Sequence, residues 1–201
     1  KGAGAEVIDD ISLPDQQTIR QHEINVMRTE FKVSLNSYLA GSTNQNGVNS
    51  LSDLISFNDK NAPTVMPYFQ QEQLIAAEAT NGVDDPKYIQ AMKECHRLTR
   101  GEGIDKVLSD YSCCSLVAPT ISTPWAIDLL NGDNRLGGSS CLAAVSGYPS
   151  VTLPMGYVSG LPVGLSFIGG AWEDHSIIDL AYAFEQTSLV RQPPGHPARF
   201  L

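Results

Sequence analysis

A run of small residues, GGSSC at positions 137–141, is the segment of this chain that most resembles a nucleophile loop. A catalytic serine needs a base in contact with it, and a catalytic cysteine needs a histidine. Two catalytic hypotheses follow, a Cys141–His175 pair and a triad built on Ser139. A structural hypothesis competes with them, in which the glycines allow a tight turn and Ser139 or Ser140 caps the helix that follows.

The structural hypothesis accounts for more of these residues. The leucine, two alanines and valine that follow Cys141 are small or apolar, as in a buried helix that packs close to a sheet. His175 lies in the segment Glu-Asp-His-Ser, just ahead of a predicted helix, where it is expected to cap the helix or face solvent. The hydrolase motifs Gly-x-Ser-x-Gly and Ser-x-x-Lys do not occur in the sequence. We therefore expect the GGSSC segment to begin a helix.

Metal and cofactor chemistry have little support in the sequence. Cys113 and Cys114 are adjacent, which fits neither a disulfide framework nor a Cys-x-x-Cys metal site. The segment HEINV, which begins at His22, lacks the second histidine of His-Glu-x-x-His. Gly2 and Gly4 have neither a preceding strand nor the third glycine of a dinucleotide-binding loop. We expect no metal ion, no cofactor and cysteines that are reduced.

The charge balance argues against several kinds of partner. The chain has 201 residues and carries 22 acidic and 13 basic side chains, a net charge of −9. Such a chain repels phosphate backbones and anionic lipid, so neither nucleic acid nor a membrane surface is an expected partner. No apolar run approaches the roughly 20 residues of a membrane-spanning helix, and residues 1–14 do not read as a signal peptide. Reduced cysteines favour a cytoplasmic location, while a missing leader would leave a periplasmic or secreted location open.

Helices dominate the first half of the predicted order of elements. A short strand is expected from Glu6 to Ile11, followed by a long helix from Gln16 to about Leu39. Asp85 followed by Pro86 predicts a helix whose first residue is the proline. Shorter helices are expected around residues 50–62, 71–80 and 103–111.

Strands and helices alternate in the second half. Residues 113–122 form a short apolar run that reaches a proline, which is typical of a strand buried on both faces. Residues 150–156 and 162–170 are predicted to form two strands joined by a turn, and residues 173–189 a closing amphipathic helix. This order of elements predicts an α/β fold.

Residues 143–194, AAVSGYPSVTLPMGYVSGLPVGLSFIGGAWEDHSIIDLAYAFEQTSLVRQPP, resemble the carboxy-terminal end of the amidase signature family. That end has a small-residue helix, Gly-x-Pro, a strand closing in Pro-x-Gly, then Gly-Leu-Pro-Val-Gly-Leu and a last helix. The resemblance continues upstream through LVAPTISTPW, DDPKYIQAM, SLSDLISFN and LNSYLA, and so covers most of the chain. The segments SLSDLISFN and TPWAIDLLNGDN make it most similar to the peptide-amidase-like branch.

The resemblance implies a mixed sheet covered by helices on both faces, and the apolar segments SLVAP and SVTLP indicate a sheet independently. It implies that residues 1–201 are the carboxy-terminal part of a single amidase domain. The α/β sheet would therefore be incomplete in this chain.

The resemblance also implies catalytic residues that this chain does not contain. The family uses a lysine and two serines, which come from a strand-end lysine, a Gly/Ser-rich loop and a Gly-Gly-Ser followed by an aliphatic residue and arginine. Here Gly137-Gly138-Ser139 is followed by Ser140 and Cys141, so no catalytic residue can be assigned. In the implied reaction the neutral lysine acts through one serine as base toward the second, which attacks the amide carbonyl before water hydrolyses the acyl-enzyme. The chain alone is expected to be inactive.

What this chain can contribute is a wall of the substrate pocket. Loops at the carboxyl ends of strands line ligand sites in open α/β sheets, and the segment PTISTPWAIDLL follows such a predicted strand. Trp125 offers a flat apolar wall, Asp128 a charge for an amine or amide group, and Ser139 a hydrogen-bond donor. The alternatives are core packing for Trp125, a loop cap for Asp128 and a helix cap for Ser139.

Three functions stay open on the sequence alone. The first is an amide hydrolase acting on a small-molecule or peptide carboxamide, with this chain as its carboxy-terminal part. The second is a degenerate or non-catalytic module that binds a partner, and the third is a transamidating subunit that delivers ammonia. A sheet cut in two would expose a strand edge and an apolar face, which predicts binding to the amino-terminal half of the same enzyme, or self-association.

Overall fold

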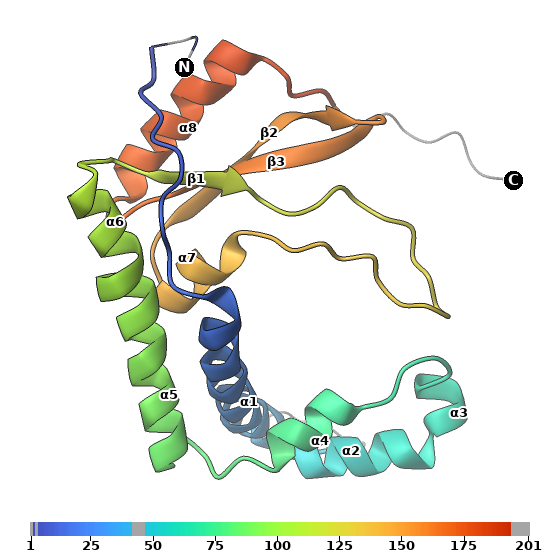
Figure 1. Ribbon diagram of the computed structural model, residues 1–201. Helices are drawn as coiled ribbons and strands as arrows, with labels where there is room; N and C mark the ends of the chain where they lie inside the picture. Colours follow the sequence, from blue (N-terminus) through green and yellow to red (C-terminus); the bar gives the residue numbers. More distant parts are fainter. Residues whose placement is uncertain (1, 3, 42–46, 194–201) are drawn as a thin grey trace, which may run out of the picture. The chain divides into compact units, whose positions relative to one another are not determined.

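The computed structural model describes residues 2, 4–41 and 47–193, which fall into two compact units. Asp15–Leu98 form a helical unit, and the residues before and after it form a second unit that contains the sheet. Figure 1 shows the helical unit in blue to green and the strands in yellow-green to orange. None of the helices in the described ranges has both the length and the apolar character to cross a bilayer.

The helical unit contains five helices within the described ranges, and local capping accounts for where several of them begin. They are α1 (Gln16–Ala40), α2 (Leu51–Lys60), α3 (Ala62–Val65), α4 (Glu72–Glu78) and α5 (Pro86–His96). Asp15 accepts the N–H of Thr18 at 2.8 Å and so caps α1. Asp85 caps α5 through the N–H of Lys87 at 2.9 Å, with Pro86 as the first helical residue. The sequence prediction for α1 and α5 is confirmed.

Buried residues and two polar links hold α1 against its neighbours. Ile19 on α1 and Leu51 on α2 are fully buried. The Tyr88 hydroxyl of α5 donates to Glu30 Oε1 on α1 at 2.7 Å, and this hydrogen bond to a carboxylate raises the pKa of Tyr88. Lys32 Nζ donates to the carbonyl oxygens of Glu78 at 2.5 Å and of Thr80 at 3.0 Å, which fixes α1 to the end of α4.

The second unit is built from short helices and a three-stranded sheet. Its elements are α6 (Asp105–Asp110), β1 (Leu116–Pro119), α7 (Ser140–Ser146), β2 (Ser150–Val158), β3 (Leu161–Ile168) and α8 (Asp174–Ser188), preceded by η1 (Arg97–Ile104). The helical path bends at Gly103, whose φ of −104° and ψ of −108° are not helical. The expected strand–turn–strand and closing helix are therefore present as β2, β3 and α8.

The strands pair in the order β1-β3-β2, and both pairs are antiparallel. Leu116 of β1 lies opposite Ile168 of β3, which in turn lies opposite Ser150 of β2. Within the described residues the sheet has no parallel pair, so the parallel strands of a mixed sheet are not in this part of the chain. The α/β class is confirmed, in the form of an incomplete sheet with helices around it.

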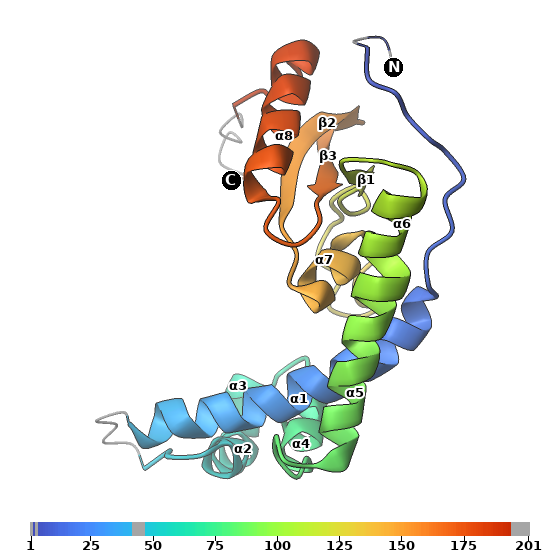
Figure 2. The ribbon, with the colours of Figure 1, turned by 90° about the vertical axis from the view of Figure 1, so that its left-hand side faces the viewer.

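One face of the sheet is covered by α8, which packs on β2 and β3. Phe167 of β3 and Phe184 of α8 meet with ring centroids 5.7 Å apart. Ile177 of α8 is 2% exposed and lies against the turn that follows β3. Helix α7 lies on the other side of β1 from α8 in both views (Figures 1 and 2). Its residues Cys141, Leu142 and Ala143 are buried.

Two predictions about strands are wrong. Residues 6–11 form no strand: they are mostly exposed, and Asp10 has a φ of +60°, which interrupts an extended backbone. The strand at β1 is not buried on both faces, because Val117 is 48% exposed although Leu116 is buried. Helix α8 packs on β2 and β3 and leaves this face of β1 uncovered.

Candidate functional site

The predicted substrate-binding residues lie on a long loop, residues 120–139, which leaves the end of β1 and returns to the start of α7 (Figure 1). The two arms of the loop meet at its base, where Ile121 and Gly138 form an isolated antiparallel bridge. Ser122 N donates to the Gly137 carbonyl at 3.2 Å, and Ser139 N donates to the Thr120 carbonyl at 3.0 Å. The base of the loop is therefore fixed by backbone hydrogen bonds.

A cluster of three hydroxyl groups holds the base of this loop to the sheet. Thr120 Oγ1 bonds to Thr152 Oγ1 of β2 and, at 2.8 Å, to Ser166 Oγ of β3. The Thr120 N–H donates to the Gly164 carbonyl at 2.8 Å. There is no room for a side chain at Gly164, because a Cβ would lie 2.7 Å from Thr120 Oγ1. Thr120 thus connects all three strands to Ser139.

Ser139 sits at the junction between loop and helix, and it is half-buried. It occupies the N-cap position of α7, but its side chain caps none of the described N–H groups of that helix. Its hydroxyl instead lies 3.5 Å from the Thr120 carbonyl oxygen, a distance typical of a weak hydrogen bond. The expectation that Ser139 caps α7 is therefore wrong, because the loop base engages this residue instead.

Trp125 and Asp128 lie further along the same loop, and each is engaged by a loop neighbour. The Trp125 Nε1–H donates to Asp133 Oδ1 at 3.0 Å, and the ring is half-buried. Asp128 accepts the N–H groups of Asn131 and Leu130, each at 2.9 Å, and the Asn131 side-chain amide at 2.8 Å. These hydrogen bonds, the backbone bond from Asn131 foremost, hold the pKa of Asp128 below its ordinary value.

These contacts bear on what the three residues can do. Asp128 is ionised at neutral pH, and it serves the loop cap that was its structural alternative. Trp125 presents a braced indole on the same loop. No contact between Ser139 and either of these two side chains occurs among the described hydrogen bonds. Their role in binding a substrate stays a prediction.

The structure does not assemble the Cys141–His175 pair. Cys141 is buried on α7. The ring of His175 is on the exposed start of α8, where its Nδ1 lies 3.1 Å from Asp179 Oδ2 one turn further along. A cysteine nucleophile needs its histidine in hydrogen-bond reach, and this histidine is directed to its own helix.

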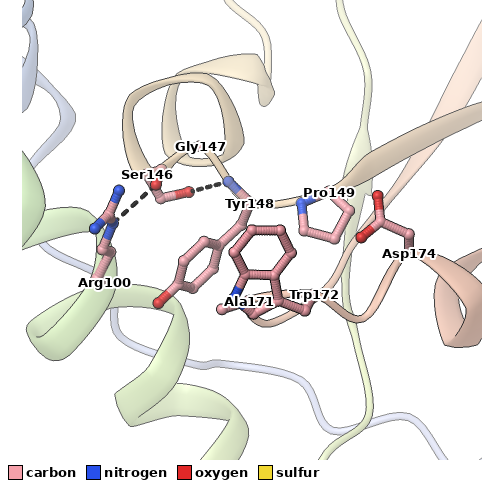
Figure 3. Close-up of a pocket in the computed structure, with 8 residues that line it drawn as sticks. All are labelled: Arg100, Ser146, Gly147, Tyr148, Pro149, Ala171, Trp172 and Asp174. Carbon is pink, nitrogen blue, oxygen red and sulfur yellow. Dashed lines mark hydrogen bonds between the residues drawn. The ribbon is translucent and has the colours of Figure 1, made fainter.

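A pocket of about 340 Å³ lies in the same unit and was not foreseen from the sequence. Its walls include Arg100, Ser146, Tyr148, Pro149, Trp172 and Asp174, which come from η1, the end of α7, the residues just before β2 and the turn before α8 (Figure 3). The Arg100 Nε donates to the Ser146 carbonyl at 2.8 Å, and its guanidinium carbon lies 5.7 Å from the centre of the Tyr148 ring. The Tyr148 hydroxyl donates to Asp105 at 2.9 Å.

The pocket and the loop of residues 120–139 are at opposite ends of the sheet. Pro149 precedes β2 and Trp172 follows β3, beside the start of β1, whereas Thr120 follows β1 and bonds to Gly164 near the start of β3. Gly164 and Gly169 are separated by five residues of extended chain, which corresponds to about 15 Å. The two features are separate sites.

A signal for the pocket exists in the sequence, although it is weak. The segments Gly-Tyr-Pro and Gly-Ala-Trp-Glu-Asp each bring an aromatic residue to a turn, but nothing in their spacing shows that the turns meet. Within the described ranges, no three side chains of histidine, cysteine, aspartate or glutamate gather as a metal site would require.

The comparisons with known proteins agree with one another. No family model matches the sequence. A probable amidase from Arabidopsis thaliana is 32% identical over 200 residues, which cover 95% of this chain and 35% of the relative. The crystal structure of peptide amidase from Stenotrophomonas maltophilia is similar with a TM-score of 0.84 and 40% identity, over 94% of this chain and 37% of that one.

A second kind of relative matches only part of the chain. One component of the glutamyl-tRNA(Gln) amidotransferase from Synechococcus is 35% identical over 91 residues, which cover 41% of this chain and 18% of the relative. The amidase relatives match nearly the whole chain, and the chain spans about a third of their length.

Proposed function

Because the chain belongs to the amidase signature family, in its peptide-amidase-like branch, we propose that it is the carboxy-terminal part of an amide hydrolase. The enzyme would cleave a carboxamide C–N bond through an acyl-enzyme formed on a serine, with a lysine and a second serine as the base. The observation that carries the proposal is 40% identity to a peptide amidase, at a TM-score of 0.84, over 94% of this chain.

The catalytic lysine and serines would lie outside this chain, and its own contribution would be structural and substrate-binding. The hydroxyl cluster of Thr120, Thr152 and Ser166 fixes the base of the loop to all three strands. A loop anchored in this way can present Trp125 to a substrate with little loss of conformational entropy. Hydrolysis is favoured over transamidation because the amidotransferase match covers only 41% of the chain.

The partner we propose is the amino-terminal part of the same enzyme. The N–H of Thr120 bonds to Gly164, so by antiparallel alternation the backbone groups of Val117 point away from β3, toward the open edge of β1. Large apolar side chains on the adjoining loop are exposed as well, with Ile127 at 85%, Leu130 at 94% and Leu136 at 79%. An open edge beside exposed apolar side chains is a surface that another part of the sheet would cover.

Sedimentation at micromolar concentration tests this partner. The chain is expected to self-associate alone, and to form a one-to-one complex with the amino-terminal part of a peptide-amidase-like enzyme. Val117→Lys places a charge on the open edge and should weaken the complex at least roughly tenfold, whereas His175→Lys, at a side chain 91% exposed on α8, should not. A compact monomer that binds neither the amino-terminal part nor an apolar dye would contradict the proposal.

Trp125→Ala tests the substrate-binding role of the loop in a protein that has both parts. We expect KM to rise about fivefold to tenfold while kcat changes little, because the indole contributes binding shared by ground and transition states. The matched control is Trp172→Ala, the chain's other tryptophan, which is 94% exposed at the opposite end of the sheet and should leave KM unchanged. A large loss of Tm with unaltered kinetics would instead identify Trp125 as a packing residue.

A further inference from the structure

The pocket bounded by Arg100, Tyr148, Trp172 and Asp174 has no part in the proposed amide chemistry, yet its walls have the features of a binding site. In Figure 3, Arg100 lies at one end and Asp174 at the other, with Tyr148, Pro149 and Trp172 between them. A cation, a carboxylate and an apolar body between them are complementary to a molecule with the reverse order of charges.

The cationic end is held in place. Arg100 Nε is bonded to the Ser146 carbonyl at 2.8 Å, and the guanidinium lies over the Tyr148 ring, whose hydroxyl is bonded to Asp105. In the part of the chain that the structure describes, the two terminal amino groups of Arg100 have no hydrogen-bond acceptor. A planar guanidinium with two free amino groups is the donor that best matches a carboxylate.

The anionic end is a single carboxylate. Asp174 is the first residue of α8, is exposed, and has no ion-pair or hydrogen-bond partner among the described residues. The neighbouring Glu173 is occupied, since it accepts the Ser176 hydroxyl at 2.6 Å. Asp174 is therefore the group in this turn that is available to an ammonium.

The conformation of Trp172 is the strongest sign that the pocket has a ligand. Its side chain is 94% exposed, and its φ is +66°, a backbone conformation that disfavours a bulky residue. An exposed indole gains little from packing, so the fold obtains no evident return for the strain. Leu189 shares the positive φ, at +49°, but there the conformation closes α8, with the Leu189 N–H bonded to the Glu185 carbonyl.

We propose that this pocket binds a small zwitterion with an apolar body, namely a free amino acid or a short peptide. The ligand's carboxylate would bind Arg100, its ammonium Asp174, and its side chain the face of Trp172. A simple anion would meet the carboxylates of Asp174 and Glu173, and a simple cation would meet Arg100, so a molecule with both charges is favoured over either. The pocket volume of about 340 Å³ suits a ligand of this size.

Calorimetric titration of the chain with four probes tests the proposal. L-Leucine and L-leucyl-L-leucine carry both charges and differ in length, so they distinguish an amino-acid site from a peptide site. 4-Methylpentanoate lacks the ammonium and 3-methylbutylamine lacks the carboxylate, and neither has an amide bond that could be cleaved. We expect one of the two zwitterions to bind, and each single-charge analogue to bind about tenfold more weakly or not at all.

Two variants link the binding to the pocket. Trp172→Gly removes the indole and relieves the positive φ, so it should fold at least as well as the parent and bind the preferred zwitterion about tenfold more weakly. Leu189→Gly relieves a positive φ at the far end of α8 and should bind as the parent does. Absence of binding by both zwitterions at millimolar concentration, or equal binding by parent and Trp172→Gly, would overturn the proposal. Neither result depends on amidase activity, so the proposed function would stand or fall separately.

Discussion

Gly169→Ala is expected to destabilise the unit that contains the sheet by about 2–3 kcal/mol, the usual cost of overpacking a filled site. Gly169 joins β3 to the turn before α8, and its N–H bonds to the Pro149 carbonyl at 3.0 Å. A Cβ at this position would lie 2.7 Å from Ile177 Cγ2 and 3.3 Å from Glu173 Cβ. Ile177 is 2% exposed and cannot move outward without opening the interface between α8 and the sheet.

Gly170→Ala is the matched control, because a Cβ there would meet nothing closer than Leu108 Cδ1 at 3.6 Å, an ordinary contact. Thermal unfolding followed by circular dichroism should show a fall in Tm of about 5–10 °C for Gly169→Ala, given the usual 2–4 °C per kcal/mol for a chain of this size. The control should change Tm by less than about 2 °C. Equal effects at the two glycines would contradict the packing of α8 described above.

The elements that local chemistry specifies could be predicted from the sequence. Asp85 and Pro86 set the start of α5 with no help from the rest of the molecule, because the capping carboxylate and the missing N–H act within one turn. The β2–β3 hairpin was predictable for the same reason, since the turn residues Ser159 and Gly160, both with positive φ, lie between two apolar runs.

The failures concern properties that depend on distant neighbours. Whether residues 6–11 form a strand depends on a pairing partner, and a sequence pattern cannot supply one. The burial of Val117 depends on which strands α8 covers. Ser139 was expected to cap α7 because its local sequence favours a cap, but its hydroxyl faces the Thr120 carbonyl, 19 residues earlier.

The pocket could not be predicted for a related reason. Its walls come from residues 100, 148 and 172, which only the folded sheet brings together. The positive φ of Trp172, the clearest sign of function there, has no signature in the sequence. The catalytic part of the prediction rests on the resemblance to amidases rather than on any cluster of residues in this chain.

Amide hydrolysis by this chain should depend completely on residues that it does not contain. Ser139 has no described basic partner, Cys141 is buried, and His175 pairs with Asp179. A serine or thiol without a base in contact is a weak nucleophile at neutral pH. The chain alone should therefore release no ammonia from peptide carboxamides, and Ser139→Ala and Cys141→Ala should leave this unchanged.

The most direct test is the rate of ammonia release from a peptide carboxamide by three samples. These are the chain alone, the chain co-expressed with the segment of the Stenotrophomonas peptide amidase that this chain does not match, and that segment alone. We predict ammonia release from the co-expressed pair and none above background from either part by itself. Ammonia release by the chain alone, abolished by Ser139→Ala or Cys141→Ala, would contradict the account and place the nucleophile in the GGSSC segment.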